Sequence, residues 1–331
     1  LVDTLTTLVE CSLVEMTSQT PTARYRILEP IRQHVLRELP SADRYDLDAR
    51  HARWFARRAQ ELQDALVSPD EAAAMDETTA ELANFRQAHR WALVHAPSTA
   101  GQLVSGLAHY EMSRYHTEIV EWFDETLAVL DPDDPWYHPT LAGATLGWAL
   151  RLRLDDVRRA CDRLDETKLS PLMRNYSGLM AANESLRAGD LAPMERLAER
   201  ALDDGVWFIA VFALRNVGRA DEAMSVATRS GIPSAIAYAN MHAARVAAHE
   251  SRDVDAERLL AQAIAAARSV SAWQSLSRSL AQWVKVAERL GLDPDEIERA
   301  RAESLEMFER SGLSERLWAH MVSRDSSSLS E

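Results

Sequence analysis

A pattern of apolar positions recurs six times along the chain. From Leu191, apolar or small residues follow at +3, +6, +7 and +10, as Met194, Leu197, Ala198 and Ala201, which is the spacing of one face of an α-helix. The pattern also starts at positions 116, 154, 220, 254 and 294, with its weakest match at 294. The intervals between neighbouring starts, 38, 37, 29, 34 and 40 residues, are close to the length of one helical hairpin. The pattern therefore predicts a solenoid of two-helix repeats.

A different pattern occupies residues 1–40. Apolar residues at Leu5, Leu8 and Val9 predict a helix, and SLVEM and ARYRIL predict two short strands near 13–16 and 24–28 on either side of a polar, Pro-containing stretch. A second helical stripe follows Pro30 and ends at Pro40. Helix, two-stranded wing and helix are the back half of a winged-helix domain. We expect its apolar surface to be exposed where the leading helices are missing.

The rest of the chain is predicted to be helical. Residues 41–100 hold two linking helices, 101–313 a superhelix of TPR-like repeats, and 314–331 a segment that ends in a disordered serine-rich tail. The predicted fold is all-α with one small β-hairpin, with over 60% of residues in helices and a right-handed superhelix. The stretch DPDDPWYHP at 131–139 is either a hinge or a stiff loop between two hairpins.

Composition narrows the function. The 331 residues carry a net charge of −14, which argues against a large nucleic-acid footprint, and 47% are hydrophobic, which argues against disorder. Two cysteines, Cys11 and Cys161, lie far apart on apolar patterns and read as reduced core residues; Cys161, at a +7 position, is expected to be buried and inert. We find no secretory segment or membrane span and expect a cytoplasmic location without membrane contact. The start at Leu1 indicates a piece of something longer.

Four stretches carry a family resemblance. LTTLVECSLVEM, RYRILEPIRQHVLREL, ARHARWFARRAQEL and AELANFRQAHRWAL resemble the segment that follows the nucleotide-binding module in bacterial STAND-type ATPase regulators of the LuxR and AfsR kind. The resemblance implies an upstream NB-ARC-like ATPase that binds ATP or ADP, a winged-helix arm and a TPR-like superhelix that senses an effector or partner. This sequence departs from the family at Cys11 and Pro30. It contains no P-loop motif, so we expect no cofactor within the chain itself.

We find no catalytic or metal constellation and predict that the chain is not an enzyme. His109, Glu111, His116 and Glu118 form the densest cluster, but Gly106 and a turn near Arg114 argue against the single continuous helix that a metal site would need. His242 and His249 lie in an Ala-rich helix, where packing explains them.

The predicted binding surface is the concave wall of the superhelix, where aromatic residues lie beside arginines. Such pairs suit a protein, peptide or small-molecule effector, although packing between repeats is the alternative reading. The candidates are Tyr110, Arg114, Trp148, Arg151, Tyr176, Asn183, Trp207, Arg215, Tyr238, Arg245 and Trp273.

Two functions are therefore predicted. The first is a non-catalytic sensor region, in which an effector changes the curvature of the superhelix near Trp148, Trp207 and Arg215 and gates the chain's own upstream ATPase. The second is a regulator that binds DNA directly through Arg24, Arg26 and Arg32 around the wing, a contact that the family arrangement disfavours.

Overall fold

The protein, described here from a computed structural model over residues 2–17 and 24–310, is almost entirely helical. About 80% of the described residues are in helices, and the sheet they contain has two strands. The predicted fold class is therefore confirmed. The chain divides into two compact units, Leu1–His51 and Ala52–Glu331, which are described separately.

The first unit contains the hairpin that the sequence predicts. Its elements are α1 (Val2–Glu10), β1 (Val14–Thr17), β2 (Arg24–Ile27), α2 (Glu29–Glu38) and the beginning of α3 (Ser41–Leu66). The strands are antiparallel, with Val14 opposite Ile27 and Thr17 opposite Arg24, and lie within one residue of their predicted positions. Pro30 lies in the first turn of α2, where its missing N–H needs no helical acceptor.

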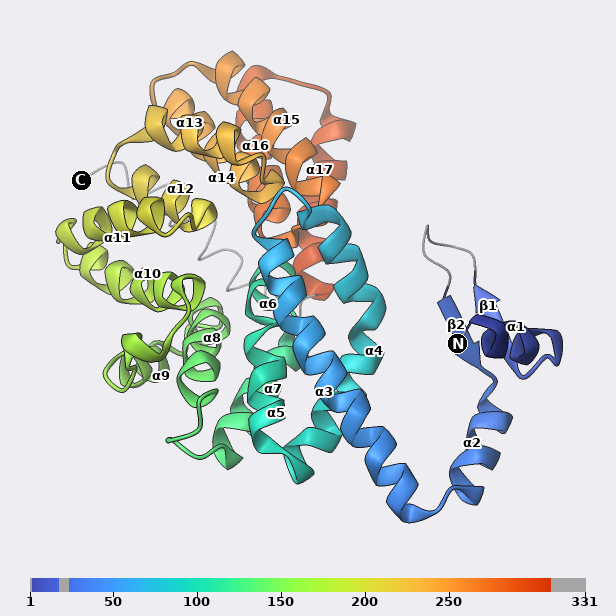
Figure 1. Cartoon of the computed structure of the whole chain (residues 1–331). Helices are drawn as coiled ribbons and strands as arrows, with labels where there is room; N and C mark the ends of the chain where they lie inside the picture. The colour runs from blue at the N-terminus through green and yellow to red at the C-terminus, as the bar shows by residue number, and fades with distance from the viewer. Residues whose placement is uncertain (1, 18–23, 311–331) are drawn as a thin grey trace. The chain divides into compact units, whose positions relative to one another are not determined.

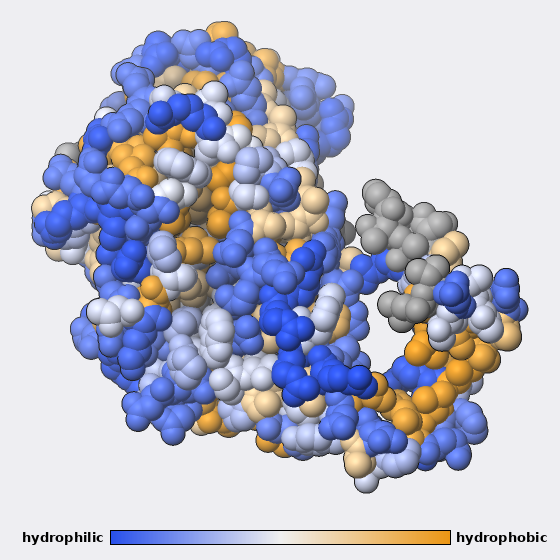
Figure 2. All heavy atoms as spheres, in the orientation of Figure 1, coloured by the Kyte–Doolittle hydropathy of each residue, from blue (hydrophilic) through white to orange (hydrophobic). Residues whose placement is uncertain are grey.

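Much of the apolar surface of this unit faces solvent. Val14 and Ala49 are buried, whereas Met16, Tyr25, Ile27 and Val35 are between 45% and 54% exposed. Figure 2 shows these hydrophobic residues as orange atoms over α2 and the hairpin. The expected apolar exposure is confirmed.

The second unit is an array of helical hairpins (Figure 1). After α3 its elements are α4 (Glu71–His95), α5 (Pro97–Ser105), α6 (Ala108–Arg114), α7 (Thr117–Val129), α8 (Tyr137–Leu150), α9 (Leu154–Cys161), the 3-10 turn η1 (Glu166–Lys168), α10 (Pro171–Arg187), α11 (Ala192–Asp203), α12 (Trp207–Asn216), α13 (Ala220–Ser230), α14 (Pro233–His249), α15 (Asp253–Ser269), α16 (Trp273–Leu290) and α17 (Pro294–Arg310). Even-numbered helices from α8 to α16 each pack against the next even-numbered helix and against the helix that follows in the chain. Within residues 100–310 there is no strand, as predicted.

The six repeated patterns are the second helices of the hairpins. They correspond to α7, α9, α11, α13, α15 and α17, which begin within one residue of the predicted starts. In α11 the predicted face is buried, from Met194 to Ala201, because these helices cover the array on one side only. The prediction fails in α15: Val254 is 72% exposed and Ala261 is also exposed, while Ala256, Leu260 and Ala263 are buried. A second apolar stripe, offset by two residues, packs there instead.

Cys161 corrects the expectation of a buried thiol, because it is partly exposed. Helix α9 ends at Cys161, so its +7 position is the last residue of the helix, whereas α11 and α13 continue past Ala198 and Ala227. The partial burial still raises the pKa of the thiol, which disfavours the reactive thiolate. Its inertness stays a prediction.

The array closes on itself. Helix α16 of the last hairpin contacts α6 of the first, and the guanidinium carbon of Arg114 lies 4.8 Å from the centre of the Trp273 ring. Nearby, the carboxylate of Glu71 accepts a hydrogen bond of 2.9 Å from the backbone N–H of Ser234 at the start of α14. We call these four residues, Glu71, Arg114, Ser234 and Trp273, the seam. It joins segments about 160 residues apart in sequence.

Candidate functional site: a cavity inside the helical array

The closed array encloses a cavity of about 520 Å³. Six helices line it, α6, α8, α10, α12, α14 and α16, together with residues of α9. Each of the six precedes the outer helix of its hairpin, so every repeat contributes its inner helix to one shared space. The cavity is therefore a product of the closure and not of any single hairpin.

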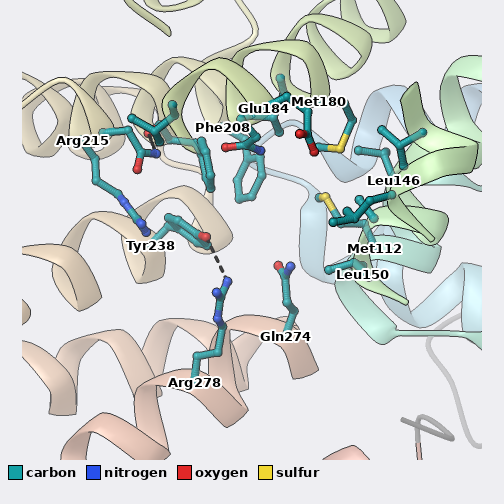
Figure 3. Close-up of a pocket in the computed structure, with 18 residues that line it drawn as sticks. Met112, Leu146, Leu150, Met180, Glu184, Phe208, Arg215, Tyr238, Gln274 and Arg278 are labelled. Atoms are coloured by element: carbon teal, nitrogen blue, oxygen red, sulfur yellow. Dashed lines mark hydrogen bonds between the residues drawn. The ribbon is translucent and has the colours of Figure 1, made fainter. Parts of the chain in front are cut away.

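One end of the cavity is apolar. Figure 3 shows Met112, Leu146 and Leu150 together on one side, with Met180 above them. Leu154, Val157 and Leu179 extend the same wall. Methionine and leucine side chains of this kind accept apolar groups of varied shape.

The opposite end carries the polar groups. Arg215 and Tyr238 lie on the far side of the cavity from Leu146 and Met112, and Arg278 and Gln274 rise from α16 between them (Figure 3). The Tyr238 hydroxyl accepts a hydrogen bond of 3.2 Å from Nη1 of Arg278. Asn183, Glu184 and Asn216 complete the polar lining. The lining thus contains two arginines and one carboxylate.

Arg215 occupies the most unusual environment of these. It is only 8% exposed, and its guanidinium carbon lies 5.2 Å from the centre of the Phe212 ring and 5.0 Å from that of Tyr238. Its Nε is buried without a hydrogen-bond partner, and no carboxylate of the described residues pairs with it. Two aromatic faces therefore hold the cation in place of an anion.

Three of the eleven candidates predicted for the concave wall line the cavity: Asn183, Arg215 and Tyr238. Their position agrees with the predicted role, while contact with an effector stays a prediction. The sequence reasoning did not name Phe208, Phe212, Gln274 or Arg278. A signal was present, because Phe208, Phe212 and Arg215 follow the i, i+4, i+7 spacing of one helix face, and Trp207, which was named, is one residue off that face.

Tyr110, Arg114 and Trp273 meet around the seam. The Tyr110 hydroxyl lies 3.0 Å from Oγ1 of Thr79, to which Nη2 of Arg114 also donates over 3.1 Å. Trp273 stacks with Arg114 as described above. These three residues join the first hairpin, the last hairpin and α4.

Trp148 and Arg151 make contacts within the first two hairpins. The Trp148 indole N–H donates to Asp124 over 2.9 Å, and Arg151 forms a 2.8 Å ion pair with the fully buried Glu111. Desolvation raises the pKa of Glu111, which the neighbouring arginine opposes. A buried pair of this kind fixes the turn between α6 and α7.

Tyr176, Arg245 and Trp207 also lie outside the cavity lining. Tyr176 is fully buried and its hydroxyl donates to Nδ1 of His109, whose pKa burial lowers to about 4. Arg245 lies 3.2 Å from Nδ1 of His242. Trp207 begins α12 and is 38% exposed.

The histidine cluster does not assemble as a metal site. His109 is in α6, whereas His116 precedes α7 beyond a left-handed residue at Tyr115, so the helix is interrupted as the sequence suggests. No group of three His, Cys, Asp or Glu side chains suited to a metal ion occurs among the described residues. In the same part of the chain, no helix is both long and apolar enough to cross a bilayer.

The arginines near the wing differ in their surroundings. Arg24 and Arg26 alternate with Tyr25 along β2 and therefore share one face of the hairpin, where Arg26 pairs in register with Glu15. Arg32 instead forms two hydrogen bonds, of 2.8 and 2.7 Å, to Glu29. These bonds lower the pKa of Glu29 to about 2.

Comparison with known proteins gives one consistent direction. No family model matches the chain. Proteins of Mycobacterium tuberculosis and Mycobacterium bovis, each named "Putative HTH-type transcriptional regulator", are 32% identical to it over 127 residues. The matched part is 38% of this chain but 14% of each relative, so the similarity covers a small share of those longer proteins. The chain is thus distantly similar to helix-turn-helix (HTH) transcriptional regulators.

Proposed function

We propose that this chain is the effector-binding region of a transcriptional regulator and that the cavity of the helical array is its effector site. The observation that carries the proposal is the cavity itself, whose volume of about 520 Å³ is within the range of small-molecule sites. Its apolar wall and few convergent polar groups suit a small molecule better than a protein. The distant similarity to HTH regulators supports the regulatory role.

In this proposal the effector acts by stabilising the closed array. A ligand that touches inner helices from the first to the last hairpin binds the closed ring better than an open one, and this difference in affinity is the free energy available for switching. A hundredfold difference supplies about 2.7 kcal/mol. By the family resemblance, the array signals to a nucleotide-binding ATPase module of the same regulator.

The cavity can be tested by filling it. We expect compounds found by thermal shift in a small-molecule library to lose at least tenfold in affinity when Leu150→Trp places an indole at the apolar end. Leu191→Trp is the matched control, because Leu191 is 44% exposed on the outer helix α11 and does not line the cavity. Compounds that bind both variants equally would locate the effector site elsewhere.

A second candidate function is direct DNA binding by the hairpin, which the shared face of Arg24 and Arg26 favours. It predicts salt-dependent binding of duplex DNA that is lost in the double variant Arg24→Ala, Arg26→Ala. The control Arg32→Ala should change binding little, since Arg32 is already engaged by Glu29. Absence of DNA binding at low salt would leave the effector-binding role alone.

A further inference from the structure

We propose that the cavity takes an anionic amphiphile, a compact apolar body that carries one carboxylate or phosphate group, and that Arg215 binds the anion. This inference rests on the proposed function, because it names the chemical class of the effector for the same cavity.

The first step of the argument is the state of Arg215. A buried guanidinium is normally paired, since removing an ionised group from water costs several kcal/mol. Arg215 is 8% exposed, and among the described residues no carboxylate pairs with it, while its Nε has no hydrogen-bond partner. Stacking on Phe212 and Tyr238 offsets part of that cost, about 0.5–2 kcal/mol for a cation over an aromatic face. The remaining deficit is what a bound anion would supply.

The second step is the set of donors around it. The Tyr238 hydroxyl already accepts from Arg278, so its own proton is left to donate. Arg215, Tyr238, Arg278 and the amide of Gln274 all line the cavity and bring N–H and O–H groups toward its polar end. Planar guanidinium groups bind carboxylate and phosphate oxygens through paired hydrogen bonds. An anion would therefore complete this end of the site.

The third step is the opposite wall. Met112, Leu146, Leu150 and Met180 present an apolar surface across the cavity from Arg215 (Figure 3). Each methylene moved from water onto such a wall contributes about 0.8 kcal/mol. The one carboxylate of the lining, Glu184, lies near Met180, away from Arg215, where it discourages a second anionic group. A ligand with one charged end and one apolar end fits both walls.

The test uses probes that share a ten-carbon tail and differ only in head group. By isothermal titration we expect decanoate or decyl phosphate to bind at least tenfold more tightly than decanol, and decylammonium to be the weakest. Comparison of the two anions identifies the preferred head group. Equal binding of decanol and both anions would overturn the inference.

The variants separate this inference from the proposed function. Arg215→Gln should reduce the affinity for the anionic probes at least tenfold and change that for decanol less than twofold. Arg153→Gln is the matched control, because Arg153 also stacks on an aromatic ring, 5.0 Å from Trp148, but is paired with Asp124 and Asp156 outside the cavity. Decanol binding that Leu150→Trp abolishes and Arg215→Gln leaves unchanged, without an anion preference, would keep the cavity site and refute the anion. Binding of every probe that is insensitive to Leu150→Trp would refute the proposed site itself.

Discussion

At the scale of single residues, Arg215 and Arg153 show the same contact in two electrostatic settings. Both guanidinium groups lie about 5 Å from an aromatic ring, but Arg153 has two carboxylate partners and is more exposed, while Arg215 is buried without one. A group kept for ligand binding commonly lowers the stability of the free protein. The two arginines should therefore respond in opposite ways to removal of their charge.

We expect Arg215→Met to leave the ligand-free protein as stable as the wild type or to stabilise it by up to about 2 kcal/mol, because an unpaired buried charge is replaced by an apolar side chain. Arg153→Met should destabilise it by about 0.5–1 kcal/mol, the usual worth of a partly exposed ion pair. Urea unfolding followed by circular dichroism measures both. A large loss of stability in Arg215→Met would show that this arginine is structural.

Glu71 gives a prediction for pH. Desolvation raises its pKa from 4.5 to about 7, so its contribution to stability is full below pH 4.5 and is lost as the pH rises through 7. At about 1.4 kcal/mol per pKa unit, the loss is roughly 3 kcal/mol. Glu71→Gln keeps an oxygen acceptor for Ser234 and cannot ionise. The stability of the variant relative to wild type should therefore increase between pH 5 and pH 8, measured by urea midpoints.

The relative measurement removes another contribution with the opposite sign. Burial lowers the pKa of His89 and His109 to about 4, and both proteins lose that stability as the pH falls below 6.5. Because both proteins contain the two histidines, their effect cancels in the difference. A difference between variant and wild type that is constant from pH 5 to pH 8 would contradict the titration of Glu71.

At the scale of helices, the outer helix of each hairpin is easier to predict than the inner one. Outer helices such as α11 bury one face, so the sequence shows the period of 3.6 and the starting residue is predictable. Inner helices such as α12 are buried on most sides, from Phe208 to Leu214, and their nearly continuous apolar run does not show which face meets the cavity. That is why Trp207 was predicted for the wall and Phe208 was missed.

The break between α5 and α6 depends on a close approach of backbones at Gly106. A Cβ atom there would lie 2.6 Å from the carbonyl carbon of Ala59 and 2.8 Å from the nitrogen of Gln60, both in α3. Gly106→Ala must therefore push α3 away, and we expect a loss of about 1–3 kcal/mol in unfolding free energy. Val254→Ala, at a site that is 72% exposed, should change it by less than about 0.5 kcal/mol. Equal effects of the two changes would mean that α3 moves freely at this point.

At the scale of the whole molecule, the closure of the array is the feature that the sequence did not show. Helical content, the hairpin and the positions of the six outer helices depend on local periodicity and were predictable. The seam depends on α6 and α16 meeting after five intervening hairpins, so small rotations at each repeat add up to its geometry. The cavity and the pairing of Arg114 with Trp273 follow from that sum.

The seam makes the last prediction. Arg278 and Gln274 reach the cavity from α16, so opening the contact between α6 and α16 should withdraw them and weaken ligand binding without removing Arg215. We expect Trp273→Ala to speed hydrogen exchange in α6 and α16 and to lower decanoate affinity about three- to tenfold, while the preference for decanoate over decanol persists. Trp207→Ala, a tryptophan that belongs neither to the seam nor to the lining, should change neither quantity. If instead Trp273→Ala leaves affinity and exchange as in the wild type, the ring is held closed by other contacts, and ligand binding is not coupled to closure through this seam.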